Sequence, residues 1–181
     1  VRLSLDAYLD KTRIPLKIDI STGDVITPRE ISFSYQLMFE NRTISLLAYP
    51  HETVLAEKLE TILSRGEANT RLRDFYDVYI LQREDFVVTP DALRYALLAT
   101  CRKRGHEDLL HTYASILDGV RQSGAMRTQW MKYQSDFDYA AGISWDTVVD
   151  TVETLCMKTL DDHAFGDELP QEESQFEMHL L

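Results

Sequence analysis

The sequence lacks the features that mark membrane, secreted and zinc-binding proteins. No apolar run in its 181 residues approaches the roughly 20 that a membrane-spanning helix needs. No charged segment followed by an apolar stretch stands at the N-terminus, so we expect no secretory signal. The two cysteines, Cys101 and Cys156, are too few for a disulfide framework or a zinc site. We therefore expect two buried thiols in a reducing cytoplasm.

Familiar catalytic motifs and positive charge are scarce as well. P-loop, Rossmann and nucleophile-elbow fingerprints are absent, and the five histidines include no HExxH motif. His106 and His111 are expected on the surface. The net charge is −11, of which −7 falls in residues 161–181, where Lys and Arg are absent. This balance argues against non-specific binding of duplex nucleic acid but allows a local pocket for phosphates.

Hydrophobic periodicity divides the chain into strands followed by helices. Alternation of apolar and polar residues predicts strands over 14–20, 32–39 and 43–49, the last two forming a hairpin. From His51 onward the period becomes helical, and helices are expected over 51–65, 71–82, 90–104, 107–123, 125–135 and 144–160. This order predicts an α+β fold with a C-terminal helical bundle. Residues 161–181 are expected to form an acidic, mobile tail or to dock on a partner.

Two basic residues of the first expected helix lie beside its buried stripe. At about 100° per residue, Lys58 and Arg65 fall at the border of the apolar face. Glu57 and Glu60 are expected on the opposite, far face. One interpretation is that both basic side chains extend from buried stems to solvent. The other is that, stacked two turns apart, they point into one site.

The second expected helix is apolar on nearly every side, which predicts burial. Asp74 and Asp77 project from it together, and buried carboxylates need a cation, a metal or hydrogen-bond donors. A purely structural arrangement is an Arg73–Asp77 ion pair with Asp74 in the first turn, where the helix dipole favours negative charge. In the functional arrangement, Lys58 and Arg65 face Asp74 across a polar cleft between the helices.

Two further groups have both a structural and a functional interpretation. Asp19 lies on the wet face of the strand over 14–20, where it is either solvated or a ligand of Mg²⁺, which prefers oxygen ligands. Four aromatic residues are expected in the core rather than in a base-stacking platform, namely Trp130, Tyr133, Phe137 and Tyr139.

Together these residues resemble the AbiEii/AbiGii-type toxin nucleotidyltransferases. The resemblance rests mainly on Ala56-Glu57-Lys58-Leu59 with Arg65, followed by Arg73-Asp74-Phe75-Tyr76-Asp77. It extends to Lys17-Ile18-Asp19-Ile20 with the following Ser21-Thr22-Gly23-Asp24 and Pro28, to Thr100–Gly105, and to Trp130–Tyr139 with Gly142-Ile143-Ser144. It covers residues 14–160.

The resemblance implies a fold, a reaction and partners. It implies a partial DNA-polymerase-β-like nucleotidyltransferase sheet over residues 1–50, a helical domain over residues 51–160 and the acidic tail 161–181. Members of this family are toxins of bacterial abortive-infection or type IV toxin–antitoxin systems. With Mg²⁺, they transfer a nucleotide from an NTP to an RNA acceptor such as a tRNA end. We therefore expect a cytoplasmic nucleotidyltransferase with a cognate antitoxin partner and no membrane association.

The resemblance also implies roles for particular residues. Lys58 would contact the triphosphate, and Asp74 would be the acidic catalytic partner, as base or orienter of the attacking hydroxyl. Arg65 and Asp77 would complete the nucleotide-binding residues. Asp19 would be a carboxylate of the metal site.

One element of the family has no counterpart in this sequence. The family opens with a Gly-Ser or Gly-Thr turn before an aspartate-rich strand, and no glycine precedes Gly23 here. The earlier acids, Asp6 and Asp10, are expected in a loop or helix. One expectation is that the chain, which opens at Val1 rather than at methionine, lacks an N-terminal segment and is inactive alone. The alternative is a non-catalytic protein-interaction module derived from the same fold.

Overall fold

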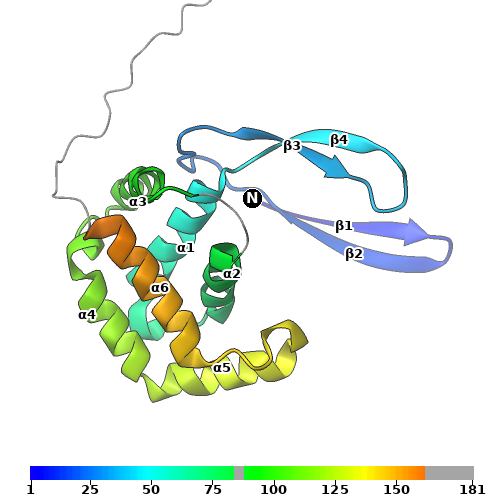
Figure 1. The fold of residues 1–181 in the computed structure, drawn as a ribbon. Coiled ribbons are helices and arrows are strands. Elements are labelled where there is room, and N and C mark those ends of the chain that lie inside the picture. The colour runs from blue at the N-terminus through cyan, green and yellow to red at the C-terminus, as the bar shows by residue number, and fades with distance from the viewer. Residues whose placement is uncertain (84–87, 162–181) are drawn as a thin grey trace, which may run out of the picture.

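The computed structural model describes residues 1–83 and 88–161. In this part of the chain, two small antiparallel sheets precede six α-helices, an α+β arrangement. The helices pack into one body, and both sheets extend from the same side of it (Figure 1). Most of the expected acidic tail lies outside the described residues. Its first residue, Asp161, accepts a hydrogen bond from the Tyr113 hydroxyl at 2.6 Å.

Each sheet is a two-stranded hairpin. β1 (Arg2–Leu9) pairs with β2 (Thr12–Asp19), and β3 (Ile31–Gln36) pairs with β4 (Thr43–Ala48). The hairpin predicted from the second and third strands is confirmed, although its first strand ends earlier than predicted. The prediction of a loop or helix is wrong for Asp6 and confirmed for Asp10, which lies in a turn. Asp6 lies within β1, and Asp10 begins the β1–β2 turn with a φ of 51°.

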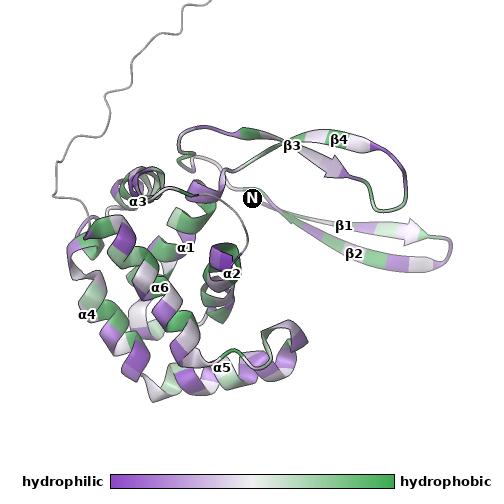
Figure 2. Ribbon diagram, in the orientation of Figure 1, coloured by the Kyte–Doolittle hydropathy of each residue, from purple (hydrophilic) through white to green (hydrophobic). Residues whose placement is uncertain are grey.

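Strict alternation makes the first hairpin amphipathic, which explains why a strand forms around Asp6. Leu5 lies opposite Leu16 on one face, and Arg2 forms an ion pair with Asp19 on the other. The alternation of apolar and hydrophilic residues along both hairpins can be followed in Figure 2. Among the residues that the structure describes, neither hairpin makes an extensive contact with a helix. Leu5 and Leu16 consequently remain 41% and 42% exposed.

The helices follow the predicted order. They are α1 (His51–Arg65), α2 (Leu72–Arg83), α3 (Pro90–Arg104), α4 (Leu109–Gln122), α5 (Gly124–Asp136) and α6 (Trp145–Leu160), with 3₁₀ turns η1 (Gly66–Ala68) and η2 (Asp138–Ala140). The predicted ends of α3 are confirmed, because Thr89 Oγ accepts from Ala92 N at 3.2 Å and Gly105 has a left-handed φ of 70°. Within the described residues, no helix is long and apolar enough to cross a membrane.

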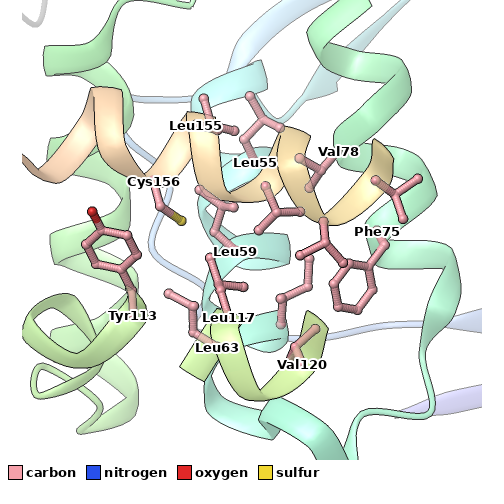
Figure 3. Close-up of a cluster of buried hydrophobic side chains, with 14 of the residues drawn as sticks. Leu55, Leu59, Leu63, Phe75, Val78, Tyr113, Leu117, Val120, Leu155 and Cys156 are labelled. Carbon is pink, nitrogen blue, oxygen red and sulfur yellow. The ribbon is translucent and has the colours of Figure 1, made fainter. Parts of the chain in front are cut away.

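The helices share a hydrophobic core, part of which is shown in Figure 3. Buried side chains from α1, α2, α4 and α6 meet there, among them Leu59, Phe75, Leu117 and Cys156. Cys101 and Cys156 are both buried, as predicted, and burial raises the pKa of each thiol to about 12. Neither is therefore a reactive thiolate at neutral pH. This core packs α1 against α2. It thereby fixes the positions of the charged side chains at the edge of the core.

The aromatic residues near the end of α5 are only partly in the core. Trp130 is 1% exposed, as predicted, but Phe137 and Tyr139 are 42% and 51% exposed. The expectation that all four aromatics are core residues is wrong for these two. Within the described residues, α5 packs mainly on α2 and η2, and its C-terminal end reaches past the other helices (Figure 1). Too few elements surround this end to bury the rings.

Candidate active site

Lys58 on α1 meets two carboxylates on α2. Its Nζ lies 2.6 Å from Asp77 Oδ2 and 3.3 Å from Asp74 Oδ1. The two aspartates are three residues apart and share a face of α2, while Lys58 directly precedes the fully buried Leu59 on the facing helix. The Asp74 side chain is only 6% exposed and that of Lys58 20%. Because these charges are partly removed from water, their attraction is stronger than in a surface pair.

The purely structural alternative, an Arg73–Asp77 ion pair, is also present but weaker. Arg73 Nε lies 3.8 Å from Asp77 Oδ1, beyond hydrogen-bond distance, and the Arg73 side chain is 76% exposed. Exposed pairs of this kind contribute little to stability. Asp74 does lie in the first turn of α2, where the helix dipole favours it. The main cation facing Asp77 is nevertheless Lys58.

One carboxylate oxygen of Asp74 accepts no hydrogen bond from any group in the described part of the chain. Asp74 Oδ2 is buried, and the Arg71 guanidinium, with its Nε 3.3 Å away, is not oriented to donate a hydrogen bond to it. An unsatisfied buried acceptor costs about 1–3 kcal/mol. This oxygen is therefore prepared to accept a hydrogen bond from a group that enters the site.

A polar cavity of about 480 Å³ opens beside this cluster, within the roughly 300–1,000 Å³ range of ligand pockets. Lys58, Arg65 and Asp74 all line it, as the functional arrangement of the two helices predicts. Arg65 is exposed and has no ion-pair partner among the described residues. Other polar side chains of the lining are Tyr49, Glu57, Glu60, Thr61, Ser64, Arg71 and Arg104.

Glu60 is buried rather than exposed on the far face of α1. It is 2% exposed because α3 packs over this side of α1. Arg104 Nη1 contacts Glu60 Oε2, and His106 Nδ1 lies 2.6 Å from Glu60 Oε1. Arg104 Nη2 also lies 3.5 Å from Glu57 Oε1. Partial burial raises the pKa of the Glu57 carboxyl, against the opposing effect of Arg104.

Asp24 connects the hairpins to the rim of the cavity. It lies in the turn region after β2 and accepts hydrogen bonds from Ser21 Oγ at 2.5 Å and from the Tyr49 hydroxyl at 2.9 Å. These two bonds, that of Ser21 first, lower the pKa of the Asp24 carboxyl. Since Tyr49 also lines the cavity, Asp24 helps to hold this side of the rim in place.

Asp19 and Asp77 are not part of the cavity lining. Asp19 ends β2, where Arg2 Nε contacts its Oδ1 at 2.5 Å and this hydrogen bond lowers the pKa of the carboxyl. Asp77 reaches the site only through its contact with Lys58. Across residues 1–83 and 88–161, no group of three or more His, Cys, Asp or Glu side chains is arranged to hold a metal ion.

Sequence analysis missed two arginines of the cavity, Arg71 and Arg104. The spacing of Arg71 and Asp74 at i and i+3 was a usable signal, since such pairs meet on a helix. Arg104 belongs to a basic run at the end of α3, where cations are common because they complement the helix dipole. No spacing rule links that run to α1, so only the packing of α3 reveals its position.

The comparisons with known proteins give one match. The family model described as nucleotidyl transferase AbiEii toxin, type IV TA system, matches residues 1–151, which is most of the chain. No curated protein and no solved structure matches.

Proposed function

Because the chain belongs to the AbiEii family of nucleotidyl transferase toxins of type IV toxin–antitoxin systems, we propose that it transfers a nucleotide from an NTP to an RNA acceptor. A tRNA end is the acceptor we favour, and phage defence by abortive infection is the corresponding biological role. The observation that carries the proposal is the contact of Lys58 with Asp74 and Asp77 at the wall of a polar cavity. The family implies an antitoxin as partner.

In the proposed mechanism, basic side chains bind the triphosphate and one carboxylate takes up a proton. Lys58 and Arg65 neutralise the phosphates, which is the main requirement of a phosphoryl-type transfer. The acceptor hydroxyl donates to the unbonded Oδ2 of Asp74. The hydroxyl oxygen of the acceptor then bonds to the α-phosphorus of the NTP. The bond between the α-phosphorus and the oxygen that bridges to the β-phosphate breaks, and pyrophosphate leaves. Asp77 holds Lys58 in position through its contact with the Lys58 ammonium group.

The proposal assigns the fold to two parts. Residues 1–50, with the two hairpins, would belong to a polymerase-β-like nucleotidyltransferase core, and residues 51–160 would form the helical domain that carries Lys58 and Asp74. The support for this division is that every strand of the described residues precedes His51. If residues of both parts contribute to the site, the helical domain would form one wall of the nucleotide pocket.

Mg²⁺ is proposed only as the ion that accompanies the NTP. Such ions are held by one or two carboxylates together with the substrate phosphates. The described residues do not make a complete site, because Asp19 is paired with Arg2 and no three potential ligands are grouped. Asp19 stays a proposed carboxylate for this ion on the ground of the family resemblance alone, since it does not line the cavity that contains Lys58.

The direct test is transfer of labelled nucleotide. The full-length protein would be incubated with Mg²⁺, total bacterial tRNA and one labelled NTP at a time, and label in RNA would support the proposal and name the nucleotide. A folded protein that labels no RNA with any NTP would favour the alternative, a non-catalytic module that binds another protein. The exposed apolar faces of the hairpins are the observation behind that alternative.

Arg65→Ala is expected to raise the KM for the NTP by roughly 10- to 100-fold with little change in kcat, because hydrogen bonds to charged groups contribute about 1.5–3 kcal/mol. Arg65 is exposed and has no ion-pair partner in the described part of the chain, so the fold should be unaffected. Steady-state kinetics with the labelled NTP would measure this. Lys158→Ala, an exposed lysine on α6, is the control. An unchanged KM would exclude Arg65 from nucleotide binding.

A further inference from the structure

A second cavity also borders Asp74. Its volume is about 400 Å³, and it is formed between the start of α2 and one face of α5. Arg71 and Asp74 line both this cavity and the one that contains Lys58. Arg71 and Asp74 therefore border both cavities, and Asp74 carries an oxygen that accepts no hydrogen bond within the described residues.

The second cavity offers cations that are accessible to a ligand. Arg71, Arg73 and Lys132 line it, against the acids Asp74 and Asp136. Lys132 is exposed and has no ion-pair partner among the described residues. Arg73 is 76% exposed and only weakly held by Asp77 at 3.8 Å. Both side chains can therefore turn toward a bound anion without breaking a strong contact, since exposed pairs contribute little.

Exposed aromatic rings continue from this cavity along the end of α5. Tyr133 lines the cavity, and its ring lies 4.8 Å from Phe137 and 6.2 Å from Tyr139. The hydroxyls of Tyr133 and Tyr139 are 2.9 Å apart, and the Tyr139 ring packs 4.7 Å from that of Tyr76. Phe137 and Tyr139 are 42% and 51% exposed, and their rings stack on each other at 5.4 Å.

We propose that this second cavity, with the aromatic rings beside it, is the subsite for the acceptor strand, a single-stranded nucleic acid end. Basic side chains next to exposed aromatic rings are the usual means by which proteins hold single strands, since cations bind the backbone and rings stack with bases. Lys132 and Arg73 hold backbone phosphates, and Tyr139 with Phe137 stacks with a base. The terminal hydroxyl then reaches Asp74 from the second cavity, while the NTP occupies the cavity that contains Lys58. This inference rests on the proposed function.

The charge of the protein is consistent with a single strand rather than a duplex. The net charge of −11 opposes binding along a duplex backbone. A single-strand end needs only a few local cations, and stacking supplies much of its affinity without regard to the charge of the protein. Asp74 borders both cavities, so an acceptor hydroxyl in the second cavity and an NTP in the first would meet at this residue, as the transfer requires.

Binding of a short, fluorescently labelled single-stranded oligoribonucleotide to the full-length protein tests the subsite directly. Lys132→Ala is expected to lower the magnitude of the slope of log K against log salt by about 0.7, the value for one backbone contact on a single strand. Tyr139→Leu is expected to weaken binding roughly 5- to 100-fold, whereas Tyr139→Phe keeps the stacking ring and binds within about 2-fold of wild type. Neither Lys132→Ala nor Tyr139→Leu should alter the affinity for an NTP.

Matched controls separate these effects from general ones. Lys158→Ala on α6 removes an equivalent exposed lysine, and Tyr95→Leu on α3 removes a tyrosine that is 36% exposed. A wild-type protein that binds no single strand, or subsite variants that match these controls, would overturn the subsite. So would tighter binding of a duplex. Single-stranded RNA and DNA of one sequence are compared to identify which acts as acceptor.

Failure of the subsite and failure of the proposed function give different results. If the wild type labels RNA and the KM for RNA is unchanged in Lys132→Ala and Tyr139→Leu, transfer is established and the subsite is wrong. If the single strand binds through these residues and no NTP yields labelled RNA, the binding site is established and the proposed transfer is wrong.

Discussion

Asp74→Asn is expected to lower nucleotide transfer by about 10²- to 10⁴-fold, the usual contribution of a positioned proton acceptor, while the protein stays folded. The amide keeps the size of the side chain but cannot take up a proton. Stability should change by less than about 1 kcal/mol, because Lys58 retains Asp77 at 2.6 Å as its partner. The unbonded Oδ2 makes this substitution easy to accommodate, since no hydrogen bond to it is lost.

Lys58→Met is the informative comparison, because it removes the cation that two carboxylates share. It should abolish transfer as well, yet it should also lower the free energy of unfolding by about 3 kcal/mol, the scale for breaking a partly buried pair. Asp74 and Asp77 would then face each other with only the more exposed Arg71 and Arg73 nearby. Asp74→Asn in the same chain should restore part of this stability without restoring activity.

Urea unfolding and the labelled-nucleotide assay measure the two effects separately. We expect Asp74→Asn to be stable and inactive, and Lys58→Met to be destabilised and inactive. Full transfer by a well-expressed Asp74→Asn protein would remove Asp74 from the chemistry. Equal stability of the two variants would show that Lys58 is not the main cation that faces these carboxylates.

Arg104→Met is expected to lower the free energy of unfolding by about 3 kcal/mol, because it leaves the carboxylate of Glu60 buried without its main cation. Glu60 is 2% exposed, and Arg104 and His106 are the groups that reach it from the end of α3. Removal of the Arg104 guanidinium should weaken the packing of α3 against α1. The cavity that contains Lys58 should be disturbed too, since Arg104 and Glu60 both line it.

Arg102→Met provides the matched control on the same helix. Arg102 pairs with Glu107 at 3.4 Å, but both side chains are more than half exposed, so its removal should change stability by less than about 1 kcal/mol. Thermal and urea unfolding of the two variants would be compared. Equal losses would mean that burial of Glu60 does not make the Arg104 contact special.

The pair of helices with Lys58, Arg65 and Asp74 could be predicted from the sequence because helical geometry is local. An angle of about 100° per residue places side chains on a face whatever the rest of the chain does. The polar cleft between the two helices was predicted because the carboxylate of Asp74 needs a cation, and Lys58 and Arg65 lie at the border of the facing helix. The end of α3 was equally predictable, since Gly105 adopts a backbone conformation that favours glycine.

Features that depend on contacts between distant segments could not be predicted in this way. Glu60 belongs to the polar face of α1 by periodicity, yet α3 covers it and supplies Arg104. Phe137 and Tyr139 have the composition of core residues, and only the position of α5 at the margin of the body exposes them. Asp6 is different, because the alternation of apolar and polar residues over Arg2–Leu9 is a local signal that already favours a strand.

The two-stranded hairpins imply that backbone amides of this protein fall into two exchange classes. Within residues 1–83 and 88–161, each strand has one neighbour, so about half of its N–H groups point to an open edge and should exchange with solvent deuterium at near-intrinsic rates. The bonded half need only a local opening of the hairpin. Amides of α1 and α6, whose side chains form the core, need global unfolding. Lys58, on α1, should therefore lie in a slowly exchanging part of the molecule, whereas the hairpins should open without unfolding the helices.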